Sequence, residues 1–419
     1  MKQHRKLVSV VSVLTALAFL RHAAAAADWP QWRGPNRDGK SPDASMLKTW
    51  PAGGPQLAWK ATGLGLGYAS VAVVGDRIYT AGDRGGENFV IALNRADGKE
   101  VWAARLGKSG APGWGGFAGV RGTPTVEGGH VYAIGQYGEF VCLDAGTGKE
   151  VWRKHFVEDF GGKLPEWGFS ESALVDGDQV VVTPGGSKGA LVALDKKTGT
   201  LRWQSKDFTD EAQYSSIIKE TIAGVPQYIQ LTMASVVGIS PKDGSVLWRA
   251  PRRGATAVIP TPIYKDGHVY VTSGYGIGCN LFKITESGGK FSAEQVYANK
   301  VMKNHHGGVI LVGDHLYGHS DSVGWVCQEF ASGKSVWEEE KKVGKGAIAY
   351  AGGMLVLREE KKKGSNVVLI EATPAGFKET GRFEQPDQSG KEAWPHPVIV
   401  GGRLYLRDQD VLLCYDVKG

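Results

Sequence analysis

The residues of this sequence that could carry out chemistry lie far apart along the chain. One carboxylate, Glu171, could serve as a general acid or base with His306 or Tyr214, as in a polysaccharide hydrolase or lyase. The adjacent pair His305 and His306 invites a metal ion, but no ligand-spacing motif accompanies it, and we predict no metal site. Serine, histidine and aspartate are too dispersed to form a recognisable triad. Any active or binding site must therefore be assembled by the fold.

A repeated segment shows how the fold could do this. "CLDAGTGKEVW", which ends at Trp152, is echoed by segments that end at Trp102, Trp203, Trp248 and Trp337. Weaker copies end at Tyr297 and Phe383, and successive ends are 40 to 51 residues apart. Each copy follows an alternating apolar hairpin such as "VAVVGDRIYTAGD". Four strands in a period of this length predict the blade of a β-propeller.

The number of blades follows from the count of units. Seven complete or near-complete units occupy Tyr68–Phe383, and an eighth has three strands at 395–417. The segment Gln56–Lys60, with Trp59 at the repeated tryptophan position, predicts the missing fourth strand. A strand from the other end of the chain would close the ring and cover both free sheet edges. We therefore predict an all-β, eight-bladed propeller, with seven blades as the alternative.

The repeat register predicts which side chains meet at one mouth of the central channel. Six of these residues precede the innermost strands of six different blades: Tyr68, Arg121, Tyr214, His306, Lys345 and Trp394. Glu171 and His305 lie beside them. Because adjacent residues of a strand point to opposite faces, we expect only one of the two histidines to face the channel.

Aromatic residues in the loops of blades two and three should hang over this mouth: Trp114, Phe117, Trp167 and Phe169. Aromatic side chains with a few polar groups suit a planar or carbohydrate-like ligand. The alternative is that the tryptophans simply fill the mouth as hydrophobic packing.

The first 27 residues predict a secretory signal. Three basic residues near the start precede the apolar run Leu7–Leu20 and a run of alanines, and we expect cleavage near Ala27. The protein would then be exported to the periplasm or the medium, and no further apolar stretch predicts a transmembrane segment. We expect residues 28–55 to pack on a propeller formed by residues 56–419, and we expect a monomer.

The net charge argues against a nucleic-acid-binding protein, and the positions of the cysteines argue against a disulfide-bonded one. Without the four basic residues of the signal, the formal net charge falls from +6 to about +2, which gives no reason to expect a nucleic-acid partner. Cys142, Cys327 and Cys414 occupy the same repeat position in three blades, too far apart to bond to one another. We expect buried, free thiols.

The repeat "LD..TGKEVW" resembles that of the pyrroloquinoline quinone (PQQ)-like β-propeller superfamily over essentially all of Tyr68–Gly419. "WPQWRGPNRDG" at residues 29–39 resembles the start of exported bacterial members labelled PQQ-binding-like or polyvinyl-alcohol-dehydrogenase-like, and "WGFSESALV" resembles their blade-entry motif. The superfamily includes quinoprotein alcohol dehydrogenases and a propeller lipoprotein of the outer-membrane assembly machinery, which is a scaffold.

The resemblance implies two functions. The first is a binding or scaffolding module whose mouth takes a protein or glycan partner. The second is a PQQ- and Ca²⁺-dependent alcohol dehydrogenase, in which Arg121 and Lys345 would pair with the quinone carboxylates, Trp167 or Trp394 would stack on the ring, and Glu171 would be the base. The sequence lacks the family's adjacent cysteine pair and a traceable Ca²⁺ ligand set. We therefore predict the binding module, with no certain cofactor, and keep the dehydrogenase and the polysaccharide enzyme as alternatives.

Overall fold

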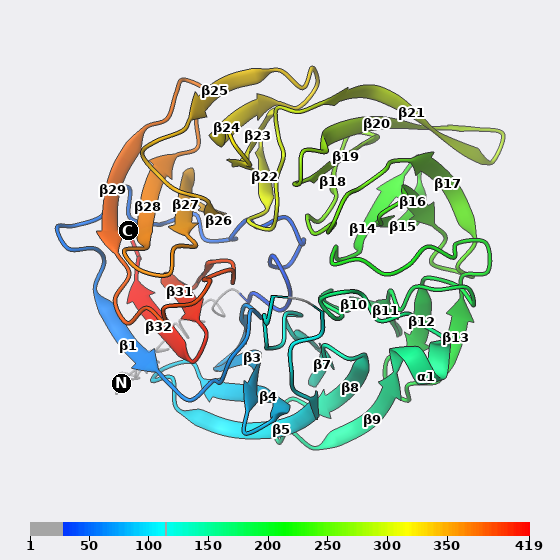
Figure 1. Ribbon diagram of the computed structural model, residues 1–419, viewed down its shortest axis with the longest axis horizontal. Helices are drawn as coiled ribbons and strands as arrows, with labels where there is room; N and C mark the ends of the chain where they lie inside the picture. The colour runs from blue at the N-terminus through cyan, green and yellow to red at the C-terminus, as the bar shows by residue number, and fades with distance from the viewer. Residues whose placement is uncertain (1–27, 114) are drawn as a thin grey trace, which may run out of the picture.

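The protein is an eight-bladed β-propeller (Figure 1). The computed structural model describes residues 28–113 and 115–419. Eight antiparallel sheets of four strands each are arranged around a central channel, which confirms the predicted fold and blade count. The predicted signal, residues 1–27, and Trp114 lie outside the described residues.

The first four blades are continuous in sequence. Their strands are β2 (Ala72–Val74), β3 (Arg77–Arg84), β4 (Glu87–Asn94) and β5 (Glu100–Lys108) in blade one; β6 (Thr125–Glu127), β7 (His130–Ile134), β8 (Glu139–Asp144) and β9 (Glu150–His155) in blade two; β10 (Leu174–Asp176), β11 (Gln179–Val182), β12 (Val192–Asp195) and β13 (Leu201–Gln204) in blade three; and β14 (Ile218–Ile222), β15 (Val225–Leu231), β16 (Ser235–Ile239) and β17 (Val246–Pro251) in blade four. A short helix, α1 (Phe156–Phe160), connects blades two and three.

The last four blades complete the ring. Their strands are β18 (Ile263–Lys265), β19 (His268–Ser273), β20 (Gly278–Ser287) and β21 (Lys290–Asn299) in blade five; β22 (Val309–Val312), β23 (His315–Ser320), β24 (Gly324–Glu329) and β25 (Ser335–Glu339) in blade six; β26 (Gly346–Ala351), β27 (Met354–Glu359), β28 (Asn366–Glu371) and β29 (Glu379–Glu384) in blade seven; and β30 (Val398–Val400), β31 (Arg403–Asp408), β32 (Val411–Asp416) and β1 (Leu57–Ala61) in blade eight.

Strand β1 closes the ring as the sequence predicts. It pairs antiparallel with β32, and Trp59 lies opposite Cys414 just as Trp152 lies opposite Cys142 in blade two. Both cysteines are buried and free, as are the other two cysteines of the chain. The outer strand of blade eight therefore comes from the start of the described chain and covers an edge that would otherwise be open.

The repeated tryptophan joins each blade to the next. Trp59 packs on Gly98, in the turn of blade one, so closely that a Cβ on this glycine would lie 2.6 Å from the indole ring. Its indole N–H donates to the Arg95 carbonyl at 3.2 Å. The same pair of contacts joins Trp102 to blade two, Trp152 to blade three, Trp203 to blade four and Tyr297 to blade six. The repeat motif thus specifies contacts between blades as well as the strands themselves.

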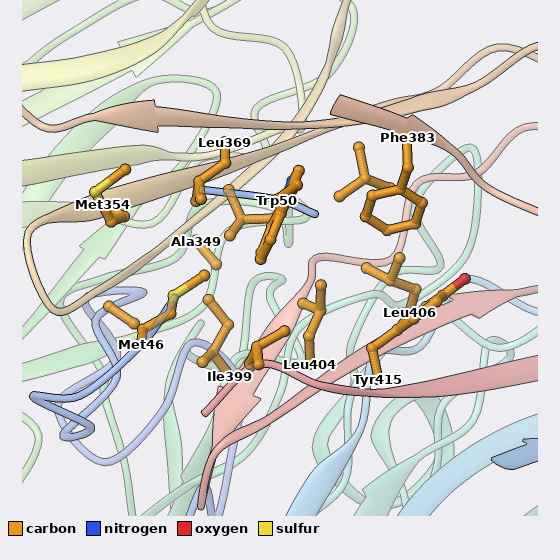
Figure 2. Close-up of a cluster of buried hydrophobic side chains, with 14 of the residues drawn as sticks. Met46, Trp50, Ala349, Met354, Leu369, Phe383, Ile399, Leu404, Leu406 and Tyr415 are labelled. Carbon is orange, nitrogen blue, oxygen red and sulfur yellow. The ribbon is translucent and has the colours of Figure 1, made fainter. Parts of the chain in front are cut away.

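Three junctions depart from this pattern. Trp337 donates to the Thr373 carbonyl of blade seven at 3.0 Å, but a Cβ on the turn residue Gly376 would meet nothing within 4 Å. Trp248 donates to Gln227 within its own blade, at 2.6 Å. In blade seven the register places Gly381 at the tryptophan position, opposite Leu369, so the assignment of Phe383 to that position is wrong by two residues. Trp50 packs against Gly381 instead. Figure 2 shows Trp50 among side chains of blades seven and eight, where it contributes to a buried cluster.

Residues 29–43, which we call the channel segment, run through the middle of the ring (blue in Figure 1). Their backbone and side chains contact every blade. The contacts are Trp29 with Val73, Pro30 with Val126, Arg37 with Ala173 and Ile217, Trp32 with Thr261, Arg33 with Val309, Ser41 with Tyr350, and Asp43 with Gly402. The channel segment is therefore part of the core of the ring. Among the described residues, no helix is long and apolar enough to cross a membrane.

Candidate functional site

A cavity of about 290 Å³ lies where the chain enters the innermost strands of the blades. Its lining comes from at least seven blades and from the channel segment. The lining residues are Trp32, Tyr68, Phe117, Arg121, Trp167, Ser170, Tyr214, Ser216, Ala257, Ile259, Tyr275, His305, His306, Trp394 and His396. Residues separated by more than 300 positions in the chain thus form one site.

The cavity brings together most of the residues singled out from the sequence. Eight of them line it: Tyr68, Phe117, Arg121, Trp167, Tyr214, His305, His306 and Trp394. Lys345 and Glu171 do not line it, and Trp114 lies outside the described residues. Phe169, expected over the mouth, is 1 % exposed and packs edge-on against Phe156, with ring centroids 4.9 Å apart. That expectation was wrong, because the side chain turns into the core between blades two and three.

Aromatic rings form the walls and the floor of this cavity. The Trp394 ring lies 4.5 Å from that of Tyr68 and 5.1 Å from that of Phe117, centroid to centroid. Trp167 and Tyr214 form a second pair, with centroids 6.0 Å apart. These separations are typical of favourable aromatic contacts and leave ring faces and edges available to a ligand.

Trp32 of the channel segment lines the cavity on the side that faces the central channel. Its indole N–H donates to the Thr261 hydroxyl at 3.0 Å, and its ring lies 4.5 Å from that of His396. Burial lowers the pKa of His396 to about 3, so this imidazole is neutral. The sequence analysis did not place Trp32 in the site, although the two tryptophans of "WPQW" were the available signal.

Arg121 supplies a positive charge to the wall. Its guanidinium lies 5.3 Å from the centroid of the Tyr68 ring and donates to the carbonyls of Phe117, at 2.6 Å, and Gly119, at 3.2 Å. In the described part of the chain it forms no ion pair with a carboxylate. Burial lowers the pKa of Arg121, which shows that its charge is incompletely solvated. An anionic group of a ligand would offset this cost.

Both adjacent histidines line the cavity, which corrects the expectation that only one could. Residues 305 and 306 precede β22 and are not in a strand, so the alternation of a strand does not apply. His306 Nε2 lies 2.8 Å from a carboxylate oxygen of Glu360. His305 Nδ1 lies 2.6 Å from the Lys345 ammonium. No group of three or more histidine, cysteine, aspartate or glutamate side chains in the described chain could hold a metal ion.

Glu171 is buried beneath the site, with 2 % of its surface exposed. One carboxylate oxygen accepts from the amide of Thr183, and the other has no partner within the described residues. Burial raises the pKa of Glu171 to about 7, and the nearby charge of Arg37 opposes this shift only in part. This carboxyl group therefore bonds to the backbone of blade three and does not line the cavity.

We expect Glu171→Gln to change how stability depends on pH. The folded-state pKa of about 7 exceeds the usual glutamate value of 4.5, so the folded protein holds this proton more tightly than the unfolded chain. The resulting stabilisation is complete below about pH 4.5 and is lost as the pH rises to about 7. Glutamine avoids this loss and should make the variant more stable than the wild type by about 2–3 kcal/mol above pH 7.

Urea unfolding followed by circular dichroism, at about pH 5 and about pH 8, measures this effect. The two proteins should differ more at the higher pH. An equal difference at both pH values would show that Glu171 is ionised throughout.

Comparisons with known proteins now give the chain a family. A family model described as outer membrane protein assembly factor BamB matches residues 86–339, more than half of the chain. The assembly factor BamB of Burkholderia pseudomallei is 27% identical over 211 residues, which cover 48% of this chain and 50% of that protein. The quinoprotein ethanol dehydrogenase of Pseudomonas aeruginosa is also 27% identical, over 42% of this chain and 31% of that protein. The chain thus spans half or less of these two curated relatives.

Solved structures agree on the fold. BamB from Moraxella catarrhalis has a TM-score of 0.59 at 16% identity, and it covers 84% of this chain and 94% of its own. The quinohemoprotein alcohol dehydrogenase of Comamonas testosteroni has a TM-score of 0.63 at 15% identity, over 94% of this chain and 81% of its own. At these identities the likeness concerns the fold alone. By the family match, the chain belongs to the PQQ-like β-propeller family whose model is described as outer membrane protein assembly factor BamB.

Proposed function

We propose that the protein is an exported binding module whose channel-mouth cavity takes a planar aromatic ligand, free or displayed by a partner. The composition of the lining carries this proposal. Ring faces from Tyr68, Trp394, Trp167 and Tyr214 surround a space of about 290 Å³, and one cation lies among them. Enclosure by aromatic side chains with a few polar groups is typical of small-molecule sites.

The lining does not favour a sugar. Sugar hydroxyl groups are donors and need acceptors, which in proteins are commonly carboxylates and side-chain amides. The described lining contains no aspartate, glutamate, asparagine or glutamine side chain. A flat aromatic ring needs fewer polar partners, so the walls suit it better. The same lack of acceptors weakens the case for a glycan partner. The polysaccharide-enzyme alternative also loses support, because its candidate acid or base, Glu171, does not line the cavity.

The residues present also do not fit a quinone held through Ca²⁺. Calcium requires several oxygen ligands, usually including carboxylates. No carboxylate is found among the described lining residues, and Lys345 is engaged by Asp321 at 3.0 Å. We therefore derive no oxidation step for this site. The likeness to quinoprotein dehydrogenases supports the fold, while the likeness to assembly factors supports a binding role.

Calorimetry on the chain that begins at Asp28 tests the proposal. We would titrate it with 2-naphthoate, indole-3-acetate and PQQ, each with and without Ca²⁺. At least one should bind in a one-to-one complex, with an affinity that Ca²⁺ does not change. Absence of binding by all three would contradict the proposal, and binding that requires Ca²⁺ would favour the dehydrogenase instead.

We expect Trp394→Ala to weaken the binding of the best of these ligands about tenfold or more, because it removes the ring that contacts both Tyr68 and Phe117. Tyr137→Ala is the matched control, since Tyr137 lies in the turn between β7 and β8 and outside the cavity lining. Equal affinities of the two variants would place the ligand elsewhere on the protein. Unchanged circular dichroism would show that both variants are folded.

A further inference from the structure

A chain of hydrogen bonds runs from a partly exposed ion pair to the cavity wall. Asp321 lies 3.0 Å from the Lys345 ammonium, which lies 2.6 Å from Nδ1 of His305. Nε2 of the same imidazole lies 2.7 Å from the Tyr275 hydroxyl. His305 and Tyr275 line the cavity, while Asp321 and Lys345 lie behind them. The chain therefore links blades five, six and seven at the mouth.

The chemistry of its members gives this chain a direction. An ammonium group can only donate, so Nδ1 of His305 must accept. Burial, with the charges of His306 and Lys345, lowers the pKa of His305 to about 2, so the imidazole is neutral. A neutral imidazole that accepts at Nδ1 carries its proton on Nε2. His305 therefore donates to the Tyr275 oxygen, and the Tyr275 proton is left for another acceptor.

The backbone holds Tyr275 in place for this role. It adopts φ of 55° between Gly274 and Gly276, in the turn that joins β19 to β20. This left-handed conformation is costly for a residue with a side chain. Ser322 and Gln409 also adopt a positive φ in the turns between the second and third strands of blades six and eight, although these turns differ in length. Tyr275 lines the cavity and contacts the imidazole, whereas Tyr137, in the corresponding turn of blade two, does not line the cavity.

We propose that Tyr275 is a specificity-determining residue that donates a hydrogen bond to a carboxylate on the aromatic ligand, with Arg121 as the cation that lines the same cavity. This inference rests on the proposed function and adds the chemical class of the ligand, an aryl carboxylate. Both polar groups offer protons to the cavity, and no carboxylate in the described lining competes for them. An ammonium-bearing ligand would meet like charge and a donor without an acceptor.

A matched pair of probes separates this inference from the proposed function. We would measure binding of 2-naphthoate and of 2-(aminomethyl)naphthalene to the chain from Asp28 by calorimetry. The naphthoate should bind at least about tenfold more tightly, and Tyr275→Phe should weaken it about tenfold while leaving the amine unaffected. Tyr137→Phe, in the corresponding turn of blade two, should change neither. Equal binding of the two probes, or no effect of Tyr275→Phe, would overturn the inference.

A second measurement does not depend on a ligand. Nitrogen NMR of 15N-histidine-labelled protein should show His305 with its proton on Nε2 alone, and Lys345→Met should allow the other tautomer to appear. A proton on Nδ1 in the wild type would overturn the donor role of Tyr275. If neither probe binds the wild type, and indole-3-acetate and PQQ do not bind either, the proposed function fails and the ligand class fails with it, whatever the tautomer.

Discussion

Replacing Arg37 with methionine is expected to destabilise the protein by about 3–5 kcal/mol. Arg37 is 3 % exposed, and its guanidinium donates to carbonyls of three residues, Ser172, Ala173 and Ile217. Burial lowers the pKa of Arg37 to about 9, so it stays charged at neutral pH. Methionine would leave these buried acceptors unpaired and would remove the positive charge beside Glu171.

The measurement is the urea midpoint near pH 8, with Arg77→Met as the control, because Arg77 only pairs with the exposed Asp76. A loss for Arg37→Met that is no larger than that of the control would show that the channel segment is not held by this side chain. The double variant with Glu171→Gln adds a further check. Glutamine should recover more stability in the Arg37→Met background than in the wild type, because the carboxylate there has lost its countercharge.

Removing residues 28–61 should prevent the propeller from folding. This truncation removes strand β1, the channel segment and the cluster around Trp50 together. It leaves β32 with an open edge and blades seven and eight without Trp50 between them. The combined loss should exceed the roughly 5–15 kcal/mol by which a domain is usually stable.

Co-expression tests this expectation. Residues 62–419 alone should be recovered as aggregate, whereas the same chain expressed with a separate 28–61 peptide should yield soluble protein with a β-rich circular dichroism spectrum. Residues 28–419 expressed intact provide the positive control. A soluble, cooperatively unfolding 62–419 chain would show that the ring closes without β1 and the channel segment.

The sequence was sufficient to predict the ring because the ring is made of repeats. At five of the eight junctions the aromatic residue at the end of a unit packs on a turn glycine of the next blade, so one motif encodes both a strand and an interface. The same register identified where Tyr68, Arg121 and Trp394 enter the channel, and these three line the cavity. It failed at Phe383, where Trp50 from outside the repeats takes the place of the expected side chain.

What could not be predicted lies outside the repeat. The channel segment occurs once, so no register places Trp32 beneath the cavity or Arg37 among the carbonyls of blades three and four. Tyr275 occupies a turn whose length differs between blades, and its partner His305 belongs to the next blade. Such contacts depend on side-chain packing between distant segments, and a single sequence carries no periodic signal for them.

The position of Trp32 has a consequence for how a ligand enters and leaves the cavity. The channel segment crosses the ring below the cavity, and its indole is fixed to Thr261. Trp32 of the channel segment therefore bounds the cavity on the side of the central channel. A ligand that enters the cavity from the side away from Trp32 must leave by that side while the channel segment stays in place. One ligand must therefore leave before the next can bind.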